Sequence, residues 1–108
     1  MDGFQKICRV SDLVNNAGKR FIIDDVDMAL IKFEDKIYAL SNVCPHQHSP
    51  LIYDGFLEDG CVVCPAHGWM FDLRTGKTPT GQRGLNSFEV KIENDTIFVK
   101  VYQKVLNW

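Results

Sequence analysis

Short runs of alternating apolar and polar residues, separated by turn-forming residues, dominate the chain. An apolar residue at every second position is typical of a half-buried strand. The pattern predicts strands over residues 4–10, 20–23, 28–33 and 37–40, joined by turns at residues 15–18, 24–27 and 34–36. Ser11 and Asp12 end the first strand and suit a cap for a single helical turn through Leu13 and Val14. No helical pattern lasts three turns, so we expect an all-β chain.

The C-terminal part alternates more regularly and predicts a β-hairpin with its turn at residues 93–96. Lys100 is predicted to point outward, on the opposite face from the apolar residues. The predicted inward face holds Phe88, Val90, Ile92, Ile97, Val99 and Val101.

Residues 41–84 look loop-like and differ from the segments on either side. They hold all four prolines, six of the eight glycines and all three histidines of the chain. A segment of this length without a core of its own is usually disordered or functional. Its many apolar residues argue against disorder, so something must order it.

Two short motifs within this segment pair a thiol with an imidazole. They are Cys44-Pro45-His46 and Cys64-Pro65-Ala66-His67, with seventeen residues between His46 and Cys64. Proline restricts the backbone after each cysteine, which reduces the entropy lost on ordering. One such pair is weak evidence, because a lone cysteine is most often a small buried apolar residue. Two pairs in one unusual segment predict loops that close over a single metal centre.

Structural zinc and a binuclear iron cluster both accept two cysteines and two histidines. Zinc sites commonly group the cysteines together and the histidines together, whereas here each loop supplies one of each. If both thiolates bind one iron and both imidazoles the other, the set suits a Rieske 2Fe-2S centre. A structural zinc module with no redox role is the alternative.

These motifs resemble those of Rieske-type ferredoxins. The resemblance rests on Cys44-Pro45-His46 with Leu51 downstream, and on the run CPAHGWMFDLRTG from Cys64 to Gly76. The chain is also similar to the ferredoxin components of ring-hydroxylating dioxygenases and to the small subunits of assimilatory nitrite reductases. The resemblance extends over nearly the whole chain, because the flanking strands and the final hairpin fit the family's all-β base.

The resemblance implies a Rieske-like fold, an antiparallel sheet base with an inserted cluster-binding subdomain. Residues 1–108 would form one domain, with the base at 1–42 and 74–108 and the subdomain at 43–73. The family also implies one 2Fe-2S cluster, with Cys44 and Cys64 on the inner iron and His46 and His67 on the outer iron.

The implied function is electron transfer rather than catalysis. A Rieske-type ferredoxin would take single electrons from an NAD(P)H-dependent flavoprotein reductase and pass them to a terminal oxygenase or another redox enzyme. The small subunit of a nitrite reductase is the alternative. An oxygenase is excluded by counting, because a mononuclear iron site needs two further histidines and the cluster leaves one.

The remaining cysteines and the third histidine receive no ligand role. Cys61 and Cys64 lie three positions apart on a predicted strand, so their side chains should face opposite sides. Cys61 and Cys8 are therefore expected to be packed core residues. His48 is expected to lie near the cluster, free to titrate near neutral pH.

Composition and charge narrow the remaining possibilities. Hydrophobic residues make up 45% and charged residues 24% of the 108 residues, which is typical of a single globular domain. A net charge of −2 argues against a nucleic-acid partner, and no apolar run approaches the ~20 residues of a membrane span. The N-terminal residues lack a signal-peptide pattern. We therefore expect a cytoplasmic protein with neither nucleic acid nor a membrane as its partner.

Two further features bear on redox tuning and on partner choice. High-potential Rieske proteins carry a disulfide at positions that correspond to Ser49 and Ala66, and hydroxyl donors at those of Trp69 and Phe71. This chain lacks all four groups, which predicts a low reduction potential.

From residue 37 to residue 73 there is no Lys or Arg, and four acids give that stretch a charge of −4. Either these acids rim the cluster and steer a basic partner, or they are solvated turn charges. They are Asp54, Glu58, Asp59 and Asp72.

Overall fold

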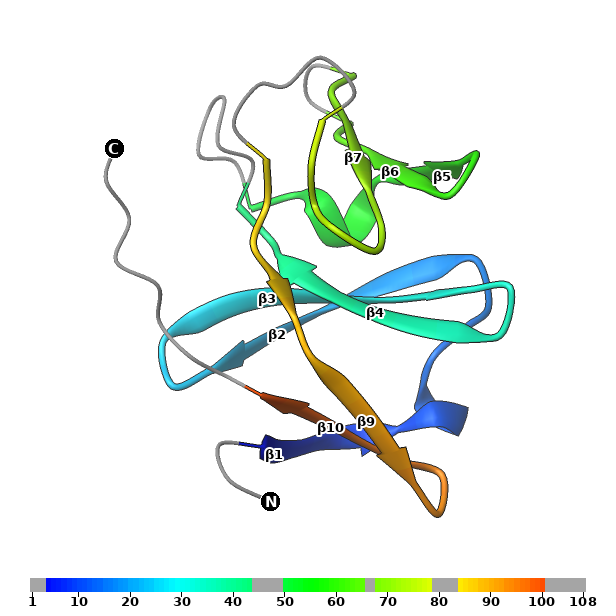
Figure 1. Cartoon of the computed structure of the whole chain (residues 1–108), viewed down its shortest axis with the longest axis vertical. Coiled ribbons are helices and arrows are strands. Elements are labelled where there is room, and N and C mark those ends of the chain that lie inside the picture. The colour runs from blue at the N-terminus through cyan, green and yellow to red at the C-terminus, as the bar shows by residue number, and fades with distance from the viewer. Residues whose placement is uncertain (1–3, 44–49, 66–67, 79–83, 101–108) are drawn as a thin grey trace.

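The computed structural model describes residues 4–43, 50–65, 68–78 and 84–100. These residues form ten strands in three antiparallel sheets, together with two short 3-10 turns (Figure 1). The prediction of an all-β fold is confirmed. Among the described residues, no helix has the length and apolar character needed to cross a membrane.

The three sheets are named by their place in Figure 1. The lower sheet contains β1 (Phe4–Arg9), β10 (Thr96–Lys100) and β9 (Val90–Glu93), in that order. The middle sheet contains β2 (Ala17–Ile23), β3 (Val26–Phe33), β4 (Lys36–Ser41) and β8 (Ser87–Phe88). The upper sheet contains β5 (Phe56–Glu58), β6 (Cys61–Val63) and β7 (Met70–Asp72). The 3-10 turns are η1 (Val10–Asp12) and η2 (Ile52–Asp54).

Two-residue turns close four of the hairpins, and both residues of each turn have positive φ. Such turns match the right-handed twist of the strands and favour Asp, Asn and Gly. The turns are Asp24–Asp25, Glu34–Asp35, Asp59–Gly60 and Asn94–Asp95. The turns predicted over residues 24–27, 34–36 and 93–96 are confirmed in place but are shorter, because the residues at their ends already pair across the strands. The turn predicted over residues 15–18 overlaps β2, which begins at Ala17.

The turn after the first strand differs from its prediction. The 3-10 turn covers Val10–Asp12 and not Leu13 and Val14, and Leu13 has extended backbone with φ −102° and ψ 145°. The Asp12 carboxylate accepts a hydrogen bond of 2.9 Å from the Arg9 backbone N–H. Leu13 leaves the turn early because its side chain packs in the protein core, where it is 6% exposed.

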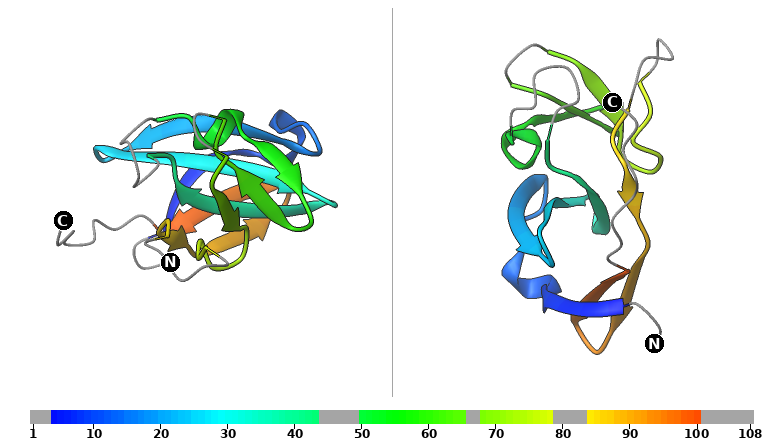
Figure 2. Two further views of the ribbon diagram at one scale, coloured as in Figure 1. Left: turned by 90° about the horizontal axis from the view of Figure 1, so that it is seen from above. Right: turned by 90° about the vertical axis from the view of Figure 1, so that its left-hand side faces the viewer.

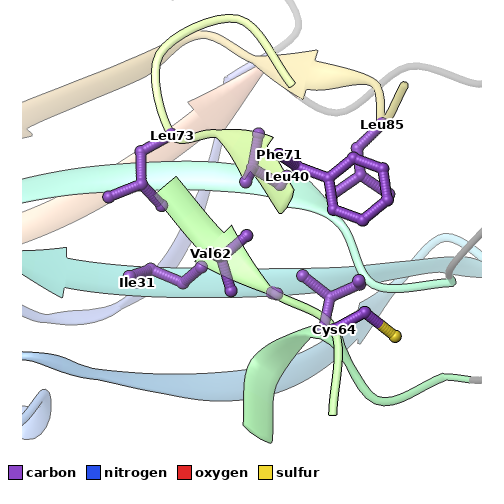
Figure 3. Close-up of a cluster of buried hydrophobic side chains, with 9 residues drawn as sticks. Ile31, Leu40, Val62, Cys64, Phe71, Leu73 and Leu85 are labelled. Carbon is purple, nitrogen blue, oxygen red and sulfur yellow. The ribbon is translucent and has the colours of Figure 1, made fainter. Parts of the chain in front are cut away.

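The middle sheet separates two hydrophobic cores. The residues of β3 from Met28 to Ile31 are all fully buried, and they alternate between the two faces of the sheet. The lower core, between the lower and middle sheets, contains Leu13, Met28, Leu30, Ala39, Phe88, Ile97 and Val99. The upper core, between the middle and upper sheets, contains Ala29, Ile31, Leu40, Ile52, Val62, Cys64, Phe71, Leu73 and Leu85 (Figure 3).

The strand predicted before the final hairpin passes from one sheet to another. Phe88 in β8 pairs with Ala39 of the middle sheet, whereas β9 pairs with β10 in the lower sheet (Figure 1). The hairpin is confirmed, and Ile92 lies opposite the buried Ile97 on the predicted inward face. Ile92 is nevertheless 48% exposed. It lies on β9, which is the edge strand of the lower sheet. Val101 lies outside the described residues.

The upper sheet lies between β4 and β8 in the chain and stacks above the middle sheet (Figure 2). Its three strands have three residues each, which is too short for alternation to be recognised. The strand predicted through Cys61 is confirmed by β6, whereas the description of residues 41–84 as loop-like is wrong for β5 and β7. The segment nevertheless has the role of a separate layer, supported from below by the upper core.

Candidate metal centre

The first predicted loop is closed at its base by Asn42. Residues 44–49 lie outside the described residues, so the positions of Cys44, His46, His48 and Ser49 are not described. On the far side of that gap, the Pro50 carbonyl oxygen accepts a hydrogen bond of 3.1 Å from Asn42 Nδ2. The Tyr53 backbone N–H donates to Asn42 Oδ1 at 2.8 Å. The two ends of the loop are therefore held side by side.

The second predicted loop connects β6 to β7 and begins at Cys64. The Cys64 backbone N–H donates to the Trp69 carbonyl at 2.8 Å, and the Gly68 N–H donates to the Cys64 carbonyl at 2.8 Å. Gly68 has a φ of +74°, a left-handed conformation that glycine adopts without steric cost. These two bonds close a tight turn between the strands. Ala66 and His67, within this turn, lie outside the described residues.

Both loops rest on the same core. Ile52, just after the first loop, and Cys64, at the start of the second, are fully buried members of the upper core. The backbones also approach closely, because a Cβ added to Gly55 would lie 2.5 Å from the Val63 carbonyl oxygen. The two cysteine–histidine motifs, seventeen residues apart in sequence, therefore start from adjacent points of one scaffold.

Cys64 has the burial and chemistry expected of an iron ligand. Its side chain is fully buried and forms no disulfide within the described part of the chain. Figure 3 shows it at the end of the upper core, opposite Leu73 and Ile31. Iron–sulfur clusters are held by cysteine thiolates, and an apolar shell limits the access of solvent to such a site. The residue therefore fits the predicted cluster.

The predicted ligand set as a whole is not assembled by the described residues. Of Cys44, His46, Cys64 and His67, only Cys64 lies within them. Among residues 4–43, 50–65, 68–78 and 84–100, no group of three or more His, Cys, Asp or Glu side chains has metal-binding geometry. The assignment of the four ligands stays a prediction.

Cys61 behaves differently from Cys64, as their spacing predicts. Val62 and Cys64 enter the upper core, whereas Cys61 belongs to neither core and is only partly buried. The prediction of opposite sides is confirmed, but the prediction that Cys61 is a core residue is wrong. Its side of the upper sheet faces away from the middle sheet. Burial, followed by the charges of Asp72 and Asp59, raises the pKa of the Cys61 thiol.

Cys8 is partly buried and packs against the lower core. Its pKa is raised by burial and by Asp12, and Lys19 opposes this shift. Cys8 therefore packs against the core, as expected, but it is not one of the buried core residues.

Three of the four acids of residues 37–73 lie at the end of the upper sheet away from Cys64. Glu58 pairs with Cys61, and Asp59 follows in the turn at the start of β6. Cys64 lies beyond the other end of β6, and Asp72 pairs with Cys61. The Asp72 carboxylate also accepts hydrogen bonds from the backbone N–H groups of Arg74 and Thr75. This placement favours turn charges over a rim around the cluster.

The two aromatic residues that follow Cys64 in the chain both contact the upper core. Phe71 is fully buried in the upper core and Trp69 packs against it, with ring centroids 6.4 Å apart. The sequence interpretation gave no place to Asn42, the buried residue whose side chain joins the two ends of the first loop. A single asparagine before a loop is ordinary in sequence, and no local pattern distinguishes one that is buried.

Comparison with known protein families gives one match over nearly the whole chain. Residues 3–101 match the Rieske 2Fe-2S domain. The chain is 33% identical over 93 residues to the ferredoxin component of the naphthalene 1,2-dioxygenase system of Pseudomonas putida, covering 83% of this chain and 88% of that protein. It is 30% identical over 94 residues to the ferredoxin component of the alkene monooxygenase system of Xanthobacter autotrophicus, covering 86% and 77%.

A longer relative matches the chain over a small part of its own length. The chain is 33% identical over 102 residues to human apoptosis-inducing factor 3, covering 93% of this chain but only 17% of that protein. The similarity therefore concerns one segment of the longer protein.

Solved structures share the fold. A chain of the complex between reduced oxygenase and oxidized ferredoxin in carbazole 1,9a-dioxygenase superposes with a TM-score of 0.82 at 25% identity, covering 98% of this chain and 100% of that chain. A structure described as a nitrite reductase small subunit from Mycobacterium tuberculosis superposes with a TM-score of 0.83 at 20% identity, covering 89% and 92%. The predicted Rieske-like fold is confirmed.

Proposed function

Because the chain belongs to the Rieske 2Fe-2S domain family, we propose that it is a one-electron carrier rather than an enzyme. Members of the family hold one 2Fe-2S cluster, which accepts and releases a single electron. The observation that carries the proposal is Cys64, a buried and unpaired thiol at the start of a tight loop on the upper core. The chain's own part is to hold the cofactor and limit its contact with water.

We propose Cys44 and Cys64 as the ligands of the inner iron, and His46 and His67 as those of the outer iron. Two ferric ions, two sulfides and two thiolates sum to a formal charge of zero when both imidazoles are neutral. An all-cysteine site would carry −2, so an added electron is repelled less by the mixed site. The common core beneath both loops supports bringing the four side chains to one centre.

The proposed division of the chain follows the two cores. Residues 43–73 would form the cluster-binding subdomain, and residues 1–42 and 74–108 the base, within one domain. The position of the upper sheet between β4 and β8 supports this division. A cytoplasmic location is a further part of the proposal, which fractionation of the source cells would test.

The proposed partners are an NAD(P)H-dependent flavoprotein reductase as donor and a terminal oxygenase or another redox enzyme as acceptor. Relatives named as ferredoxin components of monooxygenase and dioxygenase systems support this choice. A fixed small subunit of nitrite reductase is the second candidate, since such a subunit has the same fold. Co-purification with a large sirohaem-containing protein would select the second candidate.

Anaerobic purification followed by electron paramagnetic resonance of the dithionite-reduced protein tests the proposal. We expect a spectrum of a histidine-ligated 2Fe-2S cluster, with about two irons and two acid-labile sulfides per chain. Cys64→Ser should abolish the signal, whereas the matched control Cys61→Ser should retain it, because Cys61 faces the other side of the sheet. Bound zinc without acid-labile sulfide would overturn the proposal in favour of a structural zinc module.

A further inference from the structure

Asn42 is the one fully buried polar side chain among the described residues, with 0% exposure. Both donors of its amide are used, because Nδ2 donates to Asp27 Oδ1 at 3.0 Å and to the Pro50 carbonyl at 3.1 Å. Its Oδ1 accepts from the Tyr53 N–H at 2.8 Å. A buried amide is costly unless its hydrogen-bonding groups are satisfied. In this structure the amide is satisfied by Asp27 of β3 and by Pro50 and Tyr53, which follow the first predicted loop.

The backbone of Asn42 forms hydrogen bonds to the same two segments as its side chain. Its N–H donates to the Asp27 carbonyl at 2.9 Å, and its carbonyl accepts from the Ile52 N–H at 3.2 Å. Asn42 thus joins β3 to residues 50–53 through both its backbone and its side chain. The bonds to Pro50, Ile52 and Tyr53 span the segment that contains Cys44 and His46.

Asp27 is itself held in one orientation by β2. The Arg20 guanidinium donates from Nε to Asp27 Oδ1 at 3.0 Å and from Nη2 to Oδ2 at 2.7 Å. Two parallel hydrogen bonds fix the plane of a carboxylate more firmly than one. A continuous chain of bonds therefore runs from Arg20 through Asp27 to Asn42 and on to the loop.

We infer that Asn42 is a positioning residue for the first ligand loop, and that Asp27 orients it for this task. The inference rests on the proposed function, because it assumes that the loop carries Cys44 and His46 as ligands. Without the Asn42 side chain, the bond from the Ile52 N–H to the Asn42 carbonyl is the one hydrogen bond left between residue 42 and residues 50–53 of the described chain. The loop then gains freedom where it must hold the cluster still, while both cores keep their packing.

The test compares Asn42→Ala with two controls in the reconstituted, full-length protein. Ser41→Ala removes the hydroxyl that accepts from the Asn86 N–H at 3.0 Å, a bond at the same end of β4 that leads to a different segment. Val99→Ala opens a cavity in the lower core, away from both loops, and lowers stability without touching Asn42. The measurements are the rate of cluster release to an iron chelator, the reduction potential and the paramagnetic resonance of the reduced form.

We expect Asn42→Ala to release the cluster at least about tenfold faster, equivalent to about 1.4 kcal/mol, and to change both the resonance spectrum and the potential. Ser41→Ala and Val99→Ala should leave the spectrum and the potential as in the wild type. The inference is overturned if Asn42→Ala matches Ser41→Ala in all three measurements, or if Val99→Ala changes them as much.

A second pair of variants covers the case in which Asn42→Ala does not fold. Asn42→Asp keeps the side-chain shape and the acceptor for Tyr53, but it sets a carboxylate against that of Asp27. The conservative variant Asp27→Asn keeps a carbonyl acceptor for Asn42 Nδ2 but gives up one of the two hydrogen bonds from Arg20, so it should release the cluster faster than the wild type and more slowly than Asn42→Asp. Release from Asp27→Asn at the wild-type rate overturns the role of Asp27. A wild-type protein that takes up no iron and sulfide overturns the proposed function first, and the inference with it.

Discussion

Leu30 and Ile31 are consecutive residues of β3 whose side chains enter different cores. Both are fully buried, Leu30 in the lower core and Ile31 in the upper core. Replacing either residue by alanine removes three side-chain carbons, so the two substitutions are matched in chemistry and in burial. They differ in the layer that loses its support. Ile31→Ala weakens the core that contains Cys64, whereas Leu30→Ala weakens the core of the base.

The loss of stability should be similar for the two variants. Burial of each methylene stabilises a protein by roughly 0.8 kcal/mol, so three carbons account for roughly 2.4 kcal/mol of transfer free energy. The cavity left behind raises the loss to about 3–4 kcal/mol, within the range of roughly 2–5 kcal/mol for such substitutions. A loss of 1 kcal/mol lowers the melting midpoint of a small domain by roughly 4–8 °C, so both midpoints should fall by at least about 12 °C.

The two variants should differ in the rate at which they release the cluster at temperatures well below the melting midpoint. Ile31→Ala allows local opening beneath both loops, so we expect bleaching of the visible absorption by an iron chelator to accelerate at least about tenfold. Leu30→Ala should stay within about threefold of the wild type, because the described residues next to both ligand loops, Ile52 and Cys64, pack in the upper core. Far-ultraviolet circular dichroism monitors the base in parallel. Equal acceleration in the two variants would refute the separation into two cores.

Gly55→Ala should destabilise the protein more than Gly60→Ala, because an added Cβ lies 2.5 Å from the Val63 carbonyl at the first position and meets nothing within 4 Å at the second. At position 60 the only cost of an alanine is its left-handed backbone, about 1–2 kcal/mol. Equal melting midpoints of the two variants would contradict this comparison. Since burial and neighbouring acids raise the pKa of Cys61, less thiolate forms at neutral pH, and alkylation should accelerate as the pH rises. Asp72→Asn should speed that alkylation at neutral pH, as followed by mass spectrometry, and an unchanged rate would exclude the electrostatic cause. Protein-film voltammetry should give a potential near the low end of the roughly −150 to +300 mV range of such clusters, so a clearly positive value would refute the link to the absent hydroxyl donors.

Local sequence predicted the hairpins well because their turns depend on a few adjacent residues. Asp24–Asp25 and Asn94–Asp95 adopt the positive φ that two-residue turns require, and Asp and Asn tolerate this conformation better than most residues. The cysteine–histidine motifs likewise pointed to the cofactor, because ligand type and spacing are properties of the chain itself. The family match agrees with that interpretation.

Contacts between distant segments decided how deeply individual residues are buried, which the hydrophobic pattern could not predict. Ile92 alternates like a buried residue, yet it is 48% exposed because β9 is an edge strand. Cys61 resembles a core residue in sequence, yet it lies on the side of the upper sheet that faces away from the middle sheet, outside both cores.

The amino-acid order by itself determined the alternating strands, the tight turns and the chemical kind of the proposed metal ligands, since each depends on neighbouring residues. The tertiary structure alone decided that β3 supplies two cores and that Asn42 is buried between β3 and a loop. The physical reason is that burial and hydrogen-bond satisfaction depend on which distant groups come together. Asn42 acquires its role only when Asp27, Pro50 and Tyr53 surround it.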